Sequence, residues 1–143
     1  MPVDDAPKVG QVIDHRFLWL EEQAQGQIEG RKARPCLILA VEYDEADAPR
    51  VTVVPITSQR PREGALAVPI PQNLLGRLGL DATRPAWVAL DDANDFTWPG
   101  FDVVPQRDGG FVRGQVTAGF FDQIRKTILK VRSRGRPRRI ERD

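Results

Sequence analysis

Short apolar runs that alternate with turn-forming stretches most constrain what this chain can fold into. Each run is rich in aliphatic or β-branched residues and is bounded by polar residues, glycine or proline, a pattern that is typical of β-strands. The runs lie at residues 9–20, 35–43, 50–56, 65–70 and 85–90. The sequence therefore predicts a chain that is built mainly from short strands.

Two of these runs are predicted to form a hairpin. Residues 35–43 and 50–56 are joined by DEADAP, which has the composition of a turn. Pro55 lies near the end of the second run and has no backbone N–H to donate to a neighbouring strand. We therefore expect Pro55 to lie at a sheet edge or where strand pairing stops.

Two helices are also predicted. Leu74, Leu75 and Leu78 recur at helical spacing before Gly79, which predicts a short helix with a C-terminal glycine. Thr117 can cap a longer helix near the end of the chain. The apolar face of that helix is formed by Phe120 or Phe121, Ile124, Ile128 and Val131.

Together these elements predict a mainly β fold in a single domain at residues 1–131. Several short strands, one short inserted helix and a C-terminal amphipathic helix are typical of a small, strongly bent β-barrel. A length of 143 residues is sufficient to bury one hydrophobic core. No linker divides the domain, and no internal repeat is present.

Composition narrows the class of protein further. A single cysteine excludes a disulfide framework and a cysteine-rich zinc site. The N-terminal residues are acidic and polar, unlike a secretion signal, and no apolar run reaches the length of about 20 residues that a membrane span needs. We therefore expect a soluble, cytoplasmic protein without a membrane segment.

Charge is distributed unevenly along the chain. Residues 126–143 contain eight cations and two acidic residues, a net charge of +6, whereas the whole chain carries +1. The remaining residues therefore carry −5. A basic end on an acidic body indicates a polyanionic partner or a solubilising arm. Because residues 132–143 are poor in apolar side chains, we expect a flexible basic tail.

Three cations lie just before the predicted strand at residues 35–43. Arg31, Lys32 and Arg34 form either an ordinary basic loop or an anion site that the sheet holds in place. The chain contains no phosphate-binding glycine loop and no zinc-protease or serine-hydrolase motif. With one histidine and one cysteine, it also lacks an ordinary catalytic triad or metal cage. Any chemistry must therefore use Arg, Lys, Thr, Ser, Asp and Glu.

The order of several motifs resembles the PemK/MazF family of toxin ribonucleases. The resemblance covers residues 9–131 and is most specific at Arg34-Pro35 and at VVPITS. The motifs are Gly10-Gln11-Val12, Arg34-Pro35 with the aliphatic strand that follows, VVPITS at residues 53–58, VALDD at 88–92 and GQVTAGFFDQIRKTI at 114–128. The resemblance implies an SH3-like barrel, a homodimer, cleavage of single-stranded RNA without a metal or other cofactor, and a cognate antitoxin. It also implies that Arg34 and Thr57 are the catalytic pair.

The chemistry of these two side chains fits that role. Attack of a ribose 2′-hydroxyl on its own phosphodiester builds negative charge on the non-bridging oxygens, and fixed donors lower the barrier. The guanidinium of Arg34 presents two parallel donors to a phosphate, and the Thr57 hydroxyl can reach the same group. Ser58 and Gln59 lie beside Thr57, and Arg31 and Lys32 are expected to steer RNA.

Other residues leave two interpretations open. His15 has a pKa suited to a general base but shares a row with Ile13, Phe17 and Trp19, which favours a packed core histidine. Residues 91–102 depart from the family pattern. There, Asp92 and Asn94 either read base edges or cap a turn. Phe96 and Trp98 either stack on bases or close one end of the barrel.

Two alternative functions remain. The same barrel could act as a non-catalytic binder, such as a poison of DNA gyrase, with the last helix and the tail as its binding elements. It could also be a nucleic-acid binding module without cleavage, whose affinity would weaken steeply with salt.

Overall fold

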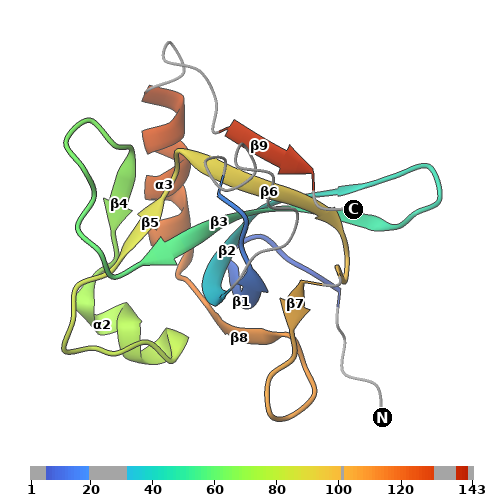
Figure 1. Ribbon diagram of the computed structural model, residues 1–143, viewed down its shortest axis with the longest axis horizontal. Helices are drawn as coiled ribbons and strands as arrows, with labels where there is room; N and C mark the ends of the chain where they lie inside the picture. Colours follow the sequence, from blue (N-terminus) through green and yellow to red (C-terminus); the bar gives the residue numbers. More distant parts are fainter. Residues whose placement is uncertain (1–5, 20–31, 101, 131–137, 142–143) are drawn as a thin grey trace.

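The computed structural model describes residues 6–19, 32–100, 102–130 and 138–141. Within these ranges nine strands form one sheet, and the predicted mainly β class is confirmed (Figure 1). The strands are β1 (Gln11–Arg16), β2 (Ala33–Tyr43), β3 (Pro49–Thr57), β4 (Ala67–Pro69), β5 (Trp87–Ala89), β6 (Asp92–Thr97), β7 (Val103–Val104), β8 (Val112–Gln115) and β9 (Arg138–Glu141). The helical segments among the described residues are α2 (Gln72–Leu75), η1 (Gly76–Leu78) and α3 (Ala118–Lys130).

The sheet is bent around the long strands β2 and β3. These two strands form the predicted hairpin, and β1 pairs with the other edge of β2. The main path of paired strands runs β4-β5-β3-β2-β1-β7, with β6 on β3, β8 on β1 and β9 on β6. The pairings between described strands therefore form an open path, and the expected barrel is not closed by hydrogen bonds.

The ladder between β2 and β3 ends at the proline that the sequence singled out. Pro55 is the last residue of β3 that pairs with β2, opposite Cys36. On its other edge, β3 pairs with β6 up to Val53 and with β5 from Ile56 onward. Because proline has no N–H to donate, it fits a position where a ladder ends. The prediction that pairing stops near Pro55 is confirmed.

Both predicted helices are present. Segments α2 and η1 end at Gly79, which adopts the left-handed conformation with φ of 69° that glycine accommodates at low cost. Helix α3 begins after Thr117, whose Oγ1 accepts a hydrogen bond of 3.2 Å from the backbone N–H of Phe120. Phe120 and Ile124 are buried, as their spacing predicts. Val131 lies outside the described residues.

The sheet is buried on both faces by two apolar clusters. The first, which we call the helix-side core, contains Val12, Leu37 and Val54 with residues of α2, η1 and α3. The second, which we call the aromatic core, is formed by Ile13, Phe17, Cys36, Ile38, Val51, Val53, Phe96, Trp98 and Val103. Adjacent residues of β1, β2 and β3 therefore point into opposite cores, as the two-residue period of a strand requires.

The C-terminal residues differ from the expected flexible tail. Arg138–Glu141 form strand β9, which pairs parallel to β6 (Figure 1). Ile140 is only 2% exposed, and Glu141 forms an ion pair with Arg50 of β3. One apolar residue in a polar segment therefore anchors the chain end on the sheet. Within the described ranges, the helices are too short or too polar to span a membrane.

Candidate functional site

Arg34 and Thr57 line the same pocket. Arg34 is the second residue of β2 and Thr57 is the last residue of β3. Cys36 pairs with Pro55, so the same antiparallel register, continued by two residues on each strand, places Arg34 across from Thr57. Both side chains line a pocket of about 230 Å³. The tertiary structure thus brings together the two residues that the sequence singled out for catalysis.

The described lining of the pocket combines basic and apolar side chains. Among the described lining residues, the cationic side chains are those of Lys32, Arg34 and Arg84, and the one carboxylate is that of Asp81. Ser58 adds a second hydroxyl beside Thr57. The apolar lining residues are Pro35, Ile56, Leu80, Pro85 and Ala86. An excess of cations beside apolar side chains suits an anionic group that carries a flat or apolar body.

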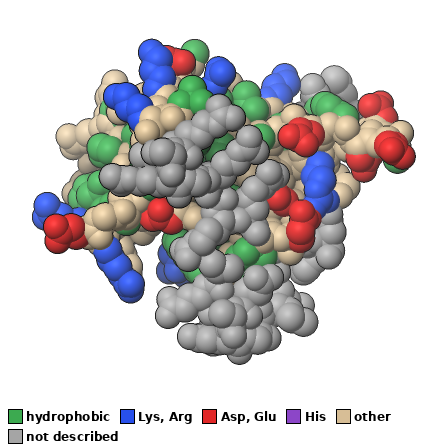
Figure 2. Space-filling view, turned by 90° about the horizontal axis from the view of Figure 1, so that it is seen from above, with side chains coloured by type: hydrophobic (Ala, Val, Ile, Leu, Met, Phe, Trp, Pro, Cys, Tyr) green, Lys and Arg blue, Asp and Glu red, His purple; other side chains and the backbone are tan. Residues whose placement is uncertain are grey.

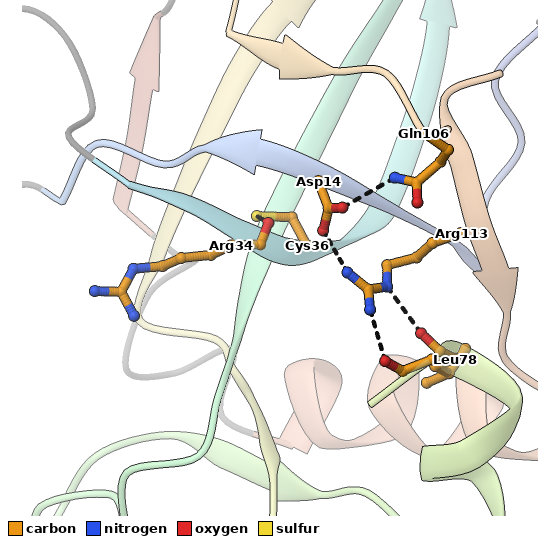
Figure 3. A network of polar contacts seen from close by, with 7 residues as sticks. Asp14, Arg34, Cys36, Leu78, Gln106 and Arg113 are labelled. Atoms are coloured by element: carbon orange, nitrogen blue, oxygen red, sulfur yellow. Dashed lines mark hydrogen bonds and ion pairs between the residues drawn. The ribbon is translucent and has the colours of Figure 1, made fainter. Parts of the chain in front are cut away.

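Arg34 is held by its surroundings without being neutralised. Its Cζ atom lies 5.8 Å from the centroid of the Trp19 ring, within the range of a cation–π contact. The Cys36 thiol donates to the Arg34 carbonyl at 3.4 Å. Figure 3 shows the Arg34 side chain extending away from Asp14 and Arg113. Within the described part of the chain, no acidic side chain forms an ion pair with Arg34, so its guanidinium is available to an incoming anion.

The Thr57 hydroxyl is oriented by the loop that follows β3. Its Oγ1 accepts a hydrogen bond of 3.1 Å from the backbone N–H of Gln59. The backbone donor fixes the oxygen, and the hydroxyl hydrogen stays available for an acceptor in the pocket. Ser58 lines the pocket together with Thr57, whereas Gln59 is exposed and does not line it.

Opposite charges are separated along strand β3. Asp44, Glu45 and Asp47 are exposed in the turn that precedes β3, and acidic side chains gather at that end of the molecule (Figure 2). Thr57 and the basic pocket lie at the other end of β3, next to β5 (Figure 1). Nine extended residues span up to about 30 Å. This polarity favours approach of an anion at the pocket end.

Three residues proposed from the sequence as RNA contacts are buried instead. Asp92, Asn94 and Trp98 are 4%, 0% and 8% exposed. The Asn94 side chain accepts from the Leu18 N–H at 2.9 Å and donates to the Leu18 carbonyl at 2.8 Å. Trp98 packs in the aromatic core, edge-on to Phe111. Because these side chains are enclosed by protein, we no longer assign them to RNA binding. Arg31 lies outside the described residues.

His15 packs against the aromatic core and does not line the pocket. It is fully buried, stacks on Phe96 with ring centroids 4.8 Å apart, and its Nε2 lies 3.3 Å from Asn94 Oδ1. His15 pairs with Arg34 in the β1–β2 register, but its ring does not line the pocket. The interpretation of His15 as a packed core histidine is confirmed.

Two charged pocket residues were missed by the sequence analysis. Asp81 and Arg84 lie in the connection between η1 and β5, which carries no periodic pattern and no known motif. Only their charge within a short loop before a strand could have drawn attention to them. Their place in the pocket depends on how the η1–β5 connection packs against the ends of β2 and β3.

The fold and the pocket define a small, mainly β protein with a basic site suited to phosphate groups. A family model described as PemK-like, MazF-like toxin of type II toxin-antitoxin system matches residues 16–96, more than half of the chain. The chain therefore belongs to this toxin family, which is generally of endoribonuclease type and implies an antitoxin partner. No curated protein and no solved structure matches the chain.

Proposed function

We propose that this chain is an endoribonuclease toxin that cleaves single-stranded RNA in the pocket formed by Arg34 and Thr57. The observation that carries the proposal is the presence of both side chains in one basic pocket at the ends of two adjacent strands. Lys32 and Ser58 line the same pocket and would contact the phosphate backbone. The proposal includes a homodimer, a cytoplasmic location and inhibition by the cognate antitoxin.

The reaction is an internal displacement at phosphorus. The 2′-oxygen forms a bond to the phosphorus, the bond to the 5′-oxygen breaks, the 2′-hydroxyl loses its proton, and the departing 5′-oxygen gains one. The products are a 2′,3′-cyclic phosphate and a 5′-hydroxyl. Arg34 would donate two parallel hydrogen bonds to the non-bridging oxygens, and Thr57 would donate a third. Since DNA lacks the attacking hydroxyl, the substrate must be RNA.

Cleavage of a single-stranded RNA by the purified chain in the presence of EDTA tests this proposal. We expect products that end in a 2′,3′-cyclic phosphate. Arg34→Ala and Thr57→Ala should each lower the cleavage rate by about 100-fold to 1000-fold, the loss typical for one donor to a developing oxyanion. Arg107→Ala provides a matched control, because Arg107 is an exposed cation that does not line the pocket.

The controls distinguish a specific role of the pocket residues from a general effect of losing one positive charge. Arg107→Ala should cleave like the wild type, and an oligonucleotide with 2′-deoxyribose throughout should stay intact. If folded wild-type protein leaves RNA intact, or if Arg34→Ala and Arg107→Ala cleave equally well, the proposed active site is wrong. Circular dichroism spectra of each variant establish that the fold is retained.

A further inference from the structure

The connection between η1 and β5 forms one wall of the pocket. Its residues Asp81 and Arg84 line the pocket together with Arg34 and Thr57. Neither residue takes part in the phosphate chemistry proposed above. A carboxylate beside a phosphate site is unfavourable for the phosphate itself, because like charges repel. Its presence there requires another explanation.

The connection is held in place by hydrogen bonds along its length. The Leu80 N–H donates to the Leu75 carbonyl at 2.9 Å, and the Arg84 N–H donates to the Asp81 carbonyl at 3.3 Å. The Gln72 side chain donates to the Ala82 carbonyl at 3.2 Å. Side chains carried by this connection are therefore presented to the pocket from a fixed backbone.

The Asp81 carboxylate is oriented by hydrogen bonds to one of its oxygens, and its other oxygen can accept a hydrogen bond from a ligand. Its Oδ1 accepts hydrogen bonds from the Thr83 N–H at 2.9 Å and from the Thr83 hydroxyl at 2.5 Å. These bonds hold the pKa of Asp81 below its ordinary value, so the group is ionised at neutral pH. Within the described part of the chain, no donor reaches Oδ2. Asp81 is thus a fixed, acceptor-only group.

The chemistry of an ionised carboxylate selects among bases. Adenine, cytosine and guanine carry an amino group on the Watson–Crick edge. This amino group can donate a hydrogen bond to a carboxylate. Uracil presents one N–H between two carbonyl oxygens, and both oxygens repel a carboxylate. Unpaired bases in single-stranded RNA expose this edge to a protein. The cations Lys32, Arg34 and Arg84 keep the pocket positive overall.

We propose that Asp81 reads the base next to the bound phosphate and selects a base with an amino group over uracil. The inference rests on the proposed function, since it assumes that the pocket takes RNA. Asp81 would then be a specificity residue that contacts the base, while Arg34 and Thr57 contact the phosphate. A good contact of this kind is worth about 1–3 kcal/mol of discrimination, which corresponds to about 5-fold to 150-fold in affinity.

Binding of non-cleavable oligonucleotides tests this proposal. The probes are single strands of adenine, cytosine or uracil, equal in length, with 2′-O-methyl groups that prevent attack on the phosphate. Fluorescence anisotropy should show at least fivefold tighter binding of the adenine or the cytosine strand than of the uracil strand. Asp81→Asn should reduce this ratio to near one, because an amide offers uracil both a donor and an acceptor.

Asp108→Asn is the matched control. Asp108 is an exposed carboxylate whose Oδ1 also accepts a backbone hydrogen bond, from the Gly110 N–H at 2.9 Å, but it does not line the pocket. This variant should keep the wild-type preference. Asp81→Ala should lose the preference in the same way as Asp81→Asn, and it provides a second variant in which no amide is introduced.

Each outcome has a distinct meaning. Equal binding of the three strands by the wild type, or a preference that survives in Asp81→Asn, overturns base reading by Asp81. In that case the proposed function still stands if Arg34→Ala weakens binding of the three oligonucleotides and the wild type cleaves RNA. If no strand binds and no RNA is cleaved, both the inference and the proposed function are wrong.

Discussion

Arg113 of β8 donates to Asp14 of β1 at 2.7 Å, across 99 residues of sequence. The same guanidinium donates through Nε to the Leu78 carbonyl at 2.8 Å and through Nη2 to the Gly79 carbonyl at 2.7 Å (Figure 3). Gln106 adds a hydrogen bond of 2.9 Å to Asp14. One cation therefore ties two strands to the C-terminal end of η1, where free carbonyls favour a positive charge.

Replacing Arg113 should destabilise the fold and loosen the pocket. Arg113→Ala removes three hydrogen bonds of a side chain that is 21% exposed, and we expect a loss of about 2 kcal/mol or more in the free energy of unfolding. Because Leu80 and Asp81 follow Gly79 directly, RNA binding should also weaken. Urea unfolding and anisotropy measure the two effects.

Two further variants make this prediction specific. Arg113→Lys can keep the contact with Asp14 but not both carbonyl contacts, and its stability should lie between wild type and Arg113→Ala. Arg107→Ala, an exposed change, should stay within about 0.5 kcal/mol of wild type. A stability of Arg113→Ala that equals that of Arg107→Ala would contradict the role of Arg113 as an anchor.

Asn94 should govern stability rather than RNA recognition. Asn94→Ala leaves the buried N–H and carbonyl of Leu18 without their side-chain partner, which should cost about 2–4 kcal/mol because each unmet buried group carries a desolvation penalty. The folded variant should bind RNA like the wild type. A variant with normal unfolding and weakened RNA affinity would restore Asn94 as a contact residue.

Strand β9 should contribute to stability through one side chain. Ile140→Ala should lower the free energy of unfolding by about 2–4 kcal/mol, because Ile140 is 2% exposed. Glu141→Gln, which weakens the ion pair with Arg50, should change it by less than about 1 kcal/mol, since the Glu141 side chain is 68% exposed. Equal and small effects would indicate that β9 does not pack on β6 in solution.

Cys36 should make stability depend on alkaline pH. Burial, and then the nearby Asp14 carboxylate, raise the pKa of the Cys36 thiol far above its ordinary value of 9.0. The folded state keeps the proton while the unfolded state loses it above about pH 9, so this contribution is complete below pH 9 and declines above it. At pH 10 the loss should be about 1 kcal/mol.

Cys36→Ala isolates this contribution. The difference in unfolding free energy between pH 7 and pH 10 should be smaller in Cys36→Ala than in the wild type by about 1 kcal/mol. A thiol reagent should also modify Cys36 only as fast as the protein unfolds. Rapid modification of the native protein, or identical pH profiles of the two proteins, would contradict the burial of this thiol.

The local pattern of residues predicted most of the secondary structure. The hairpin of β2 and β3, the end of their ladder at Pro55 and the helix cap at Thr117 each depend on a few neighbouring residues. Alternation along a strand and helical spacing are also local properties, so they can be read without knowledge of the partner. For the same reason, Arg34 and Thr57 were placed correctly at the ends of predicted strands.

The segment at residues 91–102 shows where this approach fails. Four of its first five residues, DDAND, are polar, and Asp92 and Asn94 were expected to read base edges or to cap a turn, yet five of the six residues of β6 are buried. Strand β6 is enclosed because it pairs with β3 on one edge and β9 on the other. A polar residue such as Asn94 tolerates burial only because Leu18 supplies its hydrogen bonds, and that partner lies 76 residues away.

The sequence by itself determined a mainly β chain with capped helices and placed a guanidinium and a hydroxyl at the ends of two adjacent strands. Only the tertiary structure decided that Asp81 and Arg84 line the same pocket. It also decided that Asn94 and Trp98 are buried and that Ile140 packs β9 against the rest of the protein. Periodicity is set by the geometry of one segment, whereas burial of a polar group depends on partners supplied by distant segments.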